Sequence, residues 1–454
     1  MSSRKQILLN AFSMNCVGHI NHGLWTHPRD RSQDYTRLSY WTDLARTLER
    51  GLFDGLFLAD IIGVYDIYQG SVDLTLKESV QLPVNDPILL ISAMAAATQN
   101  LGFGVTVNTS VEAPYSFARR MSTLDHLTEG RIGWNIVTGY LDSAARALGQ
   151  TGLGEHDNRY DRADDYLDVL YKLWEASWAE DAVVRDKARR VFAEPARVRP
   201  IHHEGPYYRC EGYHLAEPSP QRTPVLFQAG TSGRGRQFAA RHAECIFIGA
   251  TDPAAAARTA KALREEAVAA GRRPHDIKIF VGITVVPGRT AAEAQEKLAD
   301  YLDHASPEAG LAHFSAGSGL DLSRFELDEP IDYSPGNAIQ SVTQLARQKG
   351  WTKRQLLKEL AIGGRYPLIV GDGAEVAEQL IRWVDEGDID GFNLTRTVVP
   401  ESYVDFIDIV VPELQSRGAY KTAYAEGTLR RKLFDQGDRL PSSHAGSIEA
   451  RKLA

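Results

Sequence analysis

The sequence has few cysteines and no cysteine spacing typical of a structural metal site. Among its 454 residues are only Cys16, Cys210 and Cys245, which are far apart and form no Cys-x-x-Cys pair. An odd number of widely separated cysteines argues against a disulfide framework and against a zinc knuckle. This cysteine usage fits a reducing cytoplasm best.

The chain also lacks an excess of positive charge and a long apolar run. It has 51 Lys and Arg against 59 Asp and Glu, a formal net charge of −8. This balance argues against nucleic acid and anionic membrane surfaces as partners. No stretch approaches the roughly 18 apolar residues of a membrane span, and the apolar run near the N-terminus is too short for a secretory signal. We therefore expect a soluble, unprocessed protein.

What the sequence does contain is an alternation of short apolar runs with longer helical patterns. Eight strands are expected at residues 6–12, 55–60, 101–107, 130–137, 224–230, 243–248, 277–286 and 390–395. Helical spacing is clearest at about 38–48, 87–98, 115–124, 161–174 and 403–414. Such alternation is typical of βα units around a parallel sheet. The sequence therefore predicts an α/β fold, a (β/α)8 TIM barrel rather than an open sheet.

The length of the chain predicts large additions to this barrel. A TIM barrel needs about 250 residues, so roughly 200 residues must lie in insertions and tails. We expect one barrel domain over residues 1–454, with insertions at about 61–85, 179–222 and 306–366. The charged tail, about 419–454, is expected to be an exposed extension or a subunit-contact arm. Long loops at the carboxyl ends of barrel strands are where active sites form.

The segment 230–236, Gly-Thr-Ser-Gly-Arg-Gly-Arg, follows a predicted strand and opens a predicted helix. Small residues let backbone N–H groups approach a phosphate, Thr231 and Ser232 add hydroxyl donors, and a helix N-terminus favours an anion. Arg234 and Arg236 could strengthen such a site. The glycine order is not the dinucleotide fingerprint, and the Gly-Lys-Ser/Thr of a P-loop is absent. The alternative is an ordinary strand–helix turn capped by serine.

Other polar residues follow predicted strands. Asp60 ends a buried strand, which in a barrel faces the catalytic mouth; a helix-capping or ion-paired carboxylate is the alternative. Gly139 and Tyr140 lie just beyond the strand at 130–137, on the same face. Tyr160 could present its phenol to a phosphate, although such a tyrosine is more often a packing residue.

Cys16 and His19 follow the first strand, but no nucleophile motif supports a thiolate pair between them. A structural role is the alternative for His19, and His313 is equally ambiguous. No His-Glu-x-x-His or similar spacing is present, so no metal site can be assembled from the sequence.

Several of these motifs together carry a family resemblance that runs from about residue 6 to residue 440. The segments that carry it are Asn-Ala-Phe-Ser-Met-Asn-Cys-Val-Gly-His-Ile-Asn-His-Gly-Leu-Trp (10–25), Phe-Leu-Ala-Asp (57–60), Val-Tyr-Asp (64–66), Met-Ser-Thr-Leu-Asp-His-Leu-Thr-Glu-Gly-Arg (121–131), Trp-Asn (134–135), Glu-Pro-Ser-Pro-Gln-Arg-Thr-Pro-Val (217–225) and Gln-Ala-Gly (228–230). They closely resemble the bacterial luciferase-like, flavin-dependent monooxygenases. The resemblance is strongest to the branch with nitrilotriacetate, dibenzothiophene sulfone, dimethyl sulfide and long-chain alkane monooxygenases.

The resemblance implies a TIM barrel that binds FMN as FMNH2, supplied by a separate NAD(P)H-dependent flavin reductase. One oxygen atom of O2 then enters a small hydrophobic substrate and the other leaves as water. The N-terminal block resembles the long-chain alkane enzyme most, which implies terminal hydroxylation of an alkane. Oxygenation of an organosulfur compound, a sulfide or a sulfone, is the alternative. A non-catalytic flavin-binding protein and a metal-dependent barrel hydrolase are alternatives from other classes. A homodimer or homotetramer is also implied.

The resemblance also assigns roles to residues. Asp60 would lie at the flavin ring, and Gly139 and Tyr140 near its isoalloxazine or ribityl edge. The ribityl phosphate would be surrounded by Tyr160, Ala229, Gly230, Thr231 and Ser232. The polar residues of the reaction pocket would be Cys16, His19, Tyr65 and His313. The alkane enzyme has histidine at the position of Tyr140, where the dimethyl sulfide enzyme resembles this chain.

Overall fold

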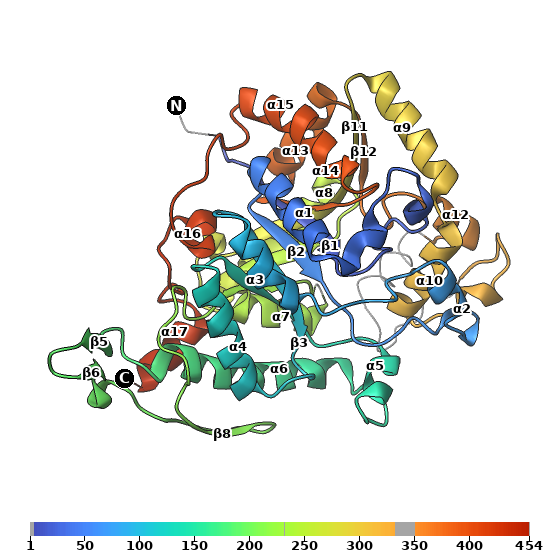
Figure 1. Cartoon of the computed structure of the whole chain (residues 1–454). Coiled ribbons are helices and arrows are strands. Elements are labelled where there is room, and N and C mark those ends of the chain that lie inside the picture. The colour runs from blue at the N-terminus through green and yellow to red at the C-terminus, as the bar shows by residue number, and fades with distance from the viewer. Residues whose placement is uncertain (1–3, 231, 332–349, 454) are drawn as a thin grey trace.

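The computed structural model describes residues 4–230, 232–331 and 350–453, and its centre is a closed barrel of parallel strands (Figure 1). The barrel strands are β1 (Leu8–Met14), β2 (Gly55–Ala59), β3 (Gly102–Asn108), β4 (Ile132–Val137), β9 (Val225–Gln228), β10 (Cys245–Ile248), β11 (Lys278–Gly288) and β13 (Gly391–Thr395). Each pairs with the next in this order, and β13 pairs with β1. The predicted (β/α)8 barrel is confirmed, and each predicted strand overlaps an observed one.

Aromatic side chains fill the interior of the barrel. Phe12, Phe57, Phe227 and Phe247 are buried there in edge-to-face contacts, with ring centroids 5.1 to 6.0 Å apart. Such geometry is favourable for aromatic pairs. Gly133 on β4 provides the space, because a Cβ there would lie 2.6 Å from the Phe227 ring.

The helices that surround the barrel bury apolar residues against it. In α1 the buried residues are Trp41, Leu44, Ala45 and Leu48, a helical repeat. The helices are α1 (Leu38–Arg50), α2 (Asp73–Lys77), α3 (Ile88–Ala96), α4 (Pro114–Leu127), α5 (Asp142–Ala147), α6 (His156–Tyr171), α7 (Gly233–His242), α8 (Pro253–Ala269), α9 (Ala291–His304), α10 (Pro307–Ser318), α12 (Lys353–Glu359), α13 (Gly373–Gly387), α14 (Glu401–Asp405), α15 (Val411–Ser416), α16 (Leu429–Phe434) and α17 (Ala445–Leu453). Among these described residues, no helix is long and apolar enough to cross a membrane.

Parts of the expected insertions pack together, whereas another projects from the barrel (Figure 1). From the segments at 61–85 and 306–366, α2, α10 and α12 gather beside one another, and Tyr68, Leu311 and Leu356 share one apolar cluster. The segment at 179–222 forms two antiparallel hairpins, β5 (Val183–Asp186) with β6 (Val191–Ala193) and β7 (Ile201–Glu204) with β8 (Arg209–Gly212). The sequence did not predict β12 (Leu368–Asp372), which pairs with the second half of β11.

The C-terminal arm differs from the sequence-based expectation of an exposed extension. Leu429 and Leu433 in α16 are buried against the apolar residues inside the barrel. A Cβ at Gly102, at the start of β3, would lie 2.6 Å from Leu429, so the arm closes the amino end of the barrel. The charged composition of the arm suggested exposure, but its Arg430 is itself buried and paired with Glu244.

We expect the arm to contribute strongly to stability through Arg430. Its guanidinium meets both carboxylate oxygens of Glu244, at 2.6 and 2.8 Å, and donates to the carbonyl of Thr223 at 2.9 Å. Arg430→Met leaves a buried charge unpaired, so the free energy of unfolding should fall by about 3 to 5 kcal/mol in urea denaturation. Arg431→Met is the matched control, because Arg431 forms only an exposed pair with Asp438 and should cost less than about 1 kcal/mol. Equal losses would contradict this assignment.

Candidate active site

The predicted site residues lie at the carboxyl ends of the barrel strands, where the chain becomes accessible to solvent. Strands β2, β3 and β4 are buried along most of their length, but their last residues, Ala59, Asn108 and Val137, are partly exposed. Asp60 follows β2 and is also partly exposed, and Ala229 after β9 is exposed. The other end of the barrel is covered by the C-terminal arm, so this end is the accessible one.

Tyr65, Tyr140 and His313 come together from three separate segments. The Tyr65 hydroxyl donates to Oε1 of Gln81 at 2.7 Å and lies 3.0 Å from the Tyr140 hydroxyl. The His313 ring, on α10, stacks on Tyr65 with the ring centroids 5.1 Å apart. Nδ1 of His313 is 3.1 Å from Nε2 of His22. Gln81 and His22 are therefore neighbours of the site that sequence analysis missed, although His22 lies within the segment 10–25.

Cys16 and His19 lie in the loop after β1, and both are held in their neutral forms. Burial raises the pKa of the Cys16 thiol to about 12, and the thiol donates to the carbonyl of Gly18. Burial, followed by the nearby Arg396 cation, lowers the pKa of His19 well below its ordinary value. A thiolate–imidazolium pair is therefore contradicted. Nδ1 of His19 is buried and has no hydrogen-bond partner among the described residues.

Arg396, which sequence analysis also missed, holds this loop. It follows β13 and is buried, and its Nη2 donates to the carbonyls of Cys16 at 2.9 Å and Val17 at 2.7 Å. Its own carbonyl accepts from Nδ2 of Asn21 at 2.7 Å. Oδ1 of Asn21 accepts from the backbone N–H of Gly363 at 2.6 Å, which adds the third insertion to the same network.

The pKa of the Asp60 carboxyl lies close to neutral pH. Burial, together with the charge of Asp86, raises the pKa of its carboxyl to about 7, although a backbone N–H from Ile61 opposes this. In the described part of the chain no helix begins next to Asp60 and no cation pairs with it. The helix-capping and ion-pair alternatives therefore do not describe this residue.

Gly139 permits a close approach between the ends of β3 and β4. Its φ is 78°, and a Cβ there would lie 2.8 Å from Nδ2 of Asn108. Glycine adopts this backbone conformation without steric cost. The chain beyond β4 can therefore turn tightly and present Tyr140 to Tyr65.

The turn after β9 brings Tyr160, Gly230 and Ser232 together. A Cβ at Gly230 would lie 2.5 Å from the Tyr160 hydroxyl and 2.2 Å from Nε2 of Gln228, so only glycine leaves these groups accessible. The Ser232 oxygen accepts from the N–H of Gly235 and caps α7, and it lies 3.4 Å from Nε2 of His156. The serine-capped turn, which was the alternative to a phosphate site, therefore also provides a helix N-terminus that favours an anion. Thr231 lies outside the described residues.

The cations beside this turn differ from the prediction. Arg234 pairs with Asp161 and Asp164, and Arg236 pairs with Glu266 at 2.9 Å, so neither serves as a free cation for a phosphate. Burial raises the pKa of Tyr160, and the charge of Arg159, on the first turn of α6, opposes this shift more than the charge of Arg234 does. Arg159 was not predicted, because the sequence-based prediction considered only the arginines within the glycine-rich segment 230–236.

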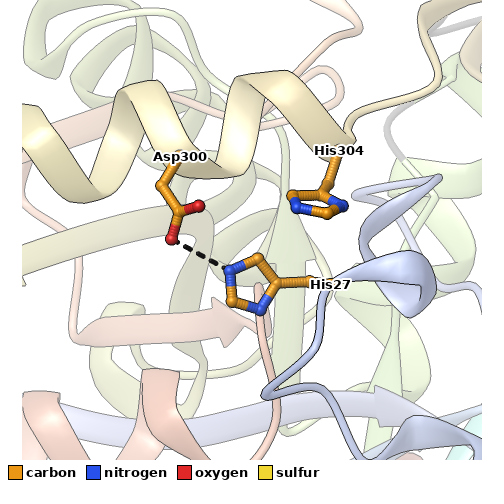
Figure 2. A group of neighbouring side chains, drawn as sticks. All are labelled: His27, Asp300 and His304. Atoms are coloured by element: carbon orange, nitrogen blue, oxygen red, sulfur yellow. Dashed lines mark hydrogen bonds and ion pairs between the residues drawn. The ribbon is translucent and has the colours of Figure 1, made fainter.

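A second group of histidine and carboxylate side chains lies outside this site (Figure 2). The ligand atoms of His27, Asp300 and His304 lie within 4.8 Å of one another, a spacing that could hold a metal ion. However, Nδ1 of His27 accepts the backbone N–H of Arg29, so its Nε2 carries the proton that it donates to Asp300 at 3.0 Å. A metal-binding nitrogen must be unprotonated. We interpret this group as a structural contact that holds α9 against the loop after β1.

The raised pKa of Asp60 predicts a pH-dependent cost in stability. The unfolded chain loses this proton at lower pH than the folded chain, so stability falls as the pH rises from about 4 to 7. Asp60→Asn removes this cost. Its free energy of unfolding should therefore exceed that of the wild type, by a margin that grows to about 1 to 2 kcal/mol above pH 7. This margin allows for the partial exposure of Asp60. Urea denaturation at pH 5 and pH 8 measures this margin. The exposed Asp303→Asn is the control, and a margin independent of pH would contradict the shift.

Comparison with known proteins agrees with this architecture. The family model described as luciferase-like monooxygenase matches residues 20–388. The dimethyl-sulfide monooxygenase of Hyphomicrobium sulfonivorans is 48% identical over 446 residues, which cover 97% of this chain and 93% of that protein. The long-chain alkane monooxygenase of Geobacillus thermodenitrificans is 50% identical over 442 residues, 97% of each chain.

A solved structure of a riboflavin lyase with modified FMN and riboflavin also superposes on this chain. Its TM-score is 0.93 at 40% sequence identity, and the match covers 98% of this chain and 99% of that one. The family model spans most of the chain, and the relatives are similar over nearly their whole length. This protein is therefore a member of the luciferase-like monooxygenase family.

Proposed function

We propose that this protein is an FMNH2-dependent, two-component monooxygenase that inserts one oxygen atom of O2 into a hydrophobic substrate. The observation that carries the proposal is the presence of two groups at one end of the barrel. The anion-favouring turn of Tyr160, Gly230 and Ser232 suits a phosphate, and the cluster of Tyr65, Tyr140 and His313 supplies neutral hydrogen-bonding groups. A flavin mononucleotide needs both.

The residues present fit FMN. Oε1 of Gln228 and Nδ1 of His19 are buried without partners among the described residues, which is unusual for polar atoms unless a ligand satisfies them. Tyr160, Ala229, Gly230, Thr231 and Ser232 would hold the phosphate, and Asp60, Gly139 and Tyr140 the ring. Bound FMNH2 supplies the electrons that split O2 between the substrate and water.

The chain's own residues orient the reactants and exclude water. Cys16, His19, Tyr65 and His313 are buried or nearly so. The pKa of each is shifted in the direction that favours the neutral form. Neutral donors can hydrogen-bond a reacting oxygen without adding a competing charge or nucleophile. Removal of water protects a reactive cofactor from side reactions. This arrangement supports cofactor-borne oxygenation over a non-catalytic flavin carrier.

A long-chain alkane, hydroxylated at its terminal carbon, is the substrate we propose first. The resemblance of the N-terminal segment to the alkane enzyme supports it. Tyr140 favours the second candidate, an organosulfur compound such as a sulfide or sulfone, because this position resembles the dimethyl sulfide enzyme. Either substrate uses the same oxygen-transfer chemistry, so the choice between them is a question of the shape of the pocket.

The proposal also includes a partner and an assembly. A separate NAD(P)H-dependent reductase would supply FMNH2 in the cytoplasm. A homodimer or homotetramer is supported by exposed apolar side chains on and beside the projecting hairpins, namely Phe192, Tyr207, Tyr213 and Leu215. Exposed apolar surface on projecting hairpins is a common feature of subunit contacts.

Substrate oxidation should require all components of the two-component system. Purified protein with a general flavin reductase, NADH, FMN and ¹⁸O2 should incorporate one labelled oxygen atom into a long-chain alkane, detected by mass spectrometry. Sulfides and sulfones are screened in parallel, and their oxidation instead of alkane oxidation would favour the second candidate. Flavin binding without incorporation into any of these compounds would favour a non-catalytic carrier.

The assignment of the phosphate site predicts losses of flavin affinity. Ser232→Ala and Tyr160→Phe each remove a hydroxyl expected to bond a charged phosphate, so each should weaken FMNH2 binding by about 0.5 to 3 kcal/mol in anaerobic titration. Thr290→Ala is the matched control, because Thr290 caps α9 in the same way outside this site. It should lower stability without changing flavin affinity. Unchanged affinity in both site variants would leave Ser232 with only its capping role.

A further inference from the structure

Arg365 belongs to a segment that is fixed over the accessible end of the barrel. The preceding Gly363 donates its N–H to Asn21, and a Cβ at Gly364 would lie 2.8 Å from Ile20, so the segment presses against the loop after β1. The following Tyr366 stacks on Phe247 of β10 with the ring centroids 5.7 Å apart. Contacts on both sides therefore hold the backbone of Arg365 beside the accessible end of the barrel.

The guanidinium of Arg365 has no carboxylate within ion-pair distance among the described residues, yet it lies among the groups of the site. Partial loss of hydration alone would lower the pKa of Arg365, but nearby Tyr366, Tyr140 and Tyr65 raise this pKa overall. Its positive charge in turn contributes to the lowered pKa values of His19 and His313. The side chain is accessible to solvent and its Cζ lies 5.6 Å from the centre of the Tyr366 ring. A cation on a fixed segment beside neutral groups is suited to an anionic ligand.

The phosphate of FMN is not the anion that this position suits best. Tyr160, at the phosphate turn, responds to the charges of Arg159 and Arg234, whereas Tyr65 and Tyr140, assigned to the pocket and ring edge, respond to Arg365. The cations beside Tyr160 thus differ from the cation beside Tyr65 and Tyr140. The isoalloxazine ring is neutral when oxidised, but the reduced ring loses a proton near neutral pH and becomes an anion.

We propose that Arg365 binds the anionic ring of reduced FMN and makes the site prefer reduced over oxidised flavin. This inference rests on the proposed function and names the residue that selects the redox state of the cofactor. A two-component enzyme takes FMNH2 from a solution that also contains FMN. A cation that pairs only with the anionic reduced ring would therefore favour binding of FMNH2 over FMN. The phosphate turn cannot provide this preference, because the phosphate is the same in both forms.

The test compares the affinities of the full-length protein for the two redox states of FMN. Dithionite-reduced FMN is titrated anaerobically and oxidised FMN aerobically, into the wild type, Arg365→Leu and Arg365→Lys. Arg365→Leu should raise the Kd for reduced FMN about tenfold or more, the usual effect of a lost hydrogen bond to a charged group, and raise the Kd for oxidised FMN much less. Arg365→Lys keeps the charge and should fall between the two.

Arg354→Leu is the matched control, because Arg354 lies in the same insertion but pairs with Asp328 on the surface. It should change neither affinity. Equal losses for both redox states in Arg365→Leu would overturn the inference, and so would no loss in either. Failure of the wild type to bind reduced FMN would instead overturn the proposed function, and the inference with it.

A second measurement is independent of affinity and of turnover. The absorbance of bound reduced FMN, followed anaerobically against pH, gives the pH at which the ring becomes anionic. The cation should hold this pH lower in the wild type than in Arg365→Leu. Besides Arg365, the titratable and charged groups at this end of the barrel that would act on a bound ring are Asp60, Asp86, Tyr65, Tyr140, Tyr366, His19, His22, His313 and Arg396. An unchanged midpoint in Arg365→Leu would show that Arg365 does not contact the ring.

Discussion

The guanidinium of Arg396 against the carbonyls of Cys16 and Val17 is the contact on which the arrangement of the site depends. Arg396 follows the last barrel strand and the two carbonyls follow the first, so the contact exists only because β13 pairs with β1 and closes the barrel. A buried guanidinium needs acceptors, and these carbonyls supply them. The loop that carries His19 and His22 is thereby fixed, and its histidines lie beside a permanent cation that favours their neutral forms.

Neutrality is the common property of the polar groups in this site. Burial raises the pKa of Cys16 and of the tyrosines and lowers that of the histidines, so each shift stabilises the uncharged form. Such a site is poorly suited to acid–base or nucleophilic catalysis but well suited to a cofactor that brings its own reactivity. Asp60 and Arg365 are the exceptions, and both are accessible enough to respond to a bound ligand.

The fold was predictable because its signals are local, whereas much of the site was not. The apolar runs of the barrel strands and the stripe of α1 are visible in short windows, and so is the turn of Gly230 and Ser232. By contrast, His22 meets His313 across 291 positions and Arg396 meets Cys16 across 380. No short window reveals such pairs. β12 was missed because it pairs with β11 alone and lies outside the alternation of eight strands that the barrel predicts.

Under the proposed function, the division between barrel and insertions would allow one flavin site to serve different substrates. The phosphate turn is built from β9, α6 and α7, which belong to the barrel, whereas Tyr65, His313 and Arg365 come from insertions. These insertions pack on each other through Tyr68, Leu311 and Leu356. His27 and Asp300 tie the loop after β1 to α9, just before α10. A changed insertion could therefore alter the proposed reaction pocket while the turn of Gly230 and Ser232 keeps its place on the barrel.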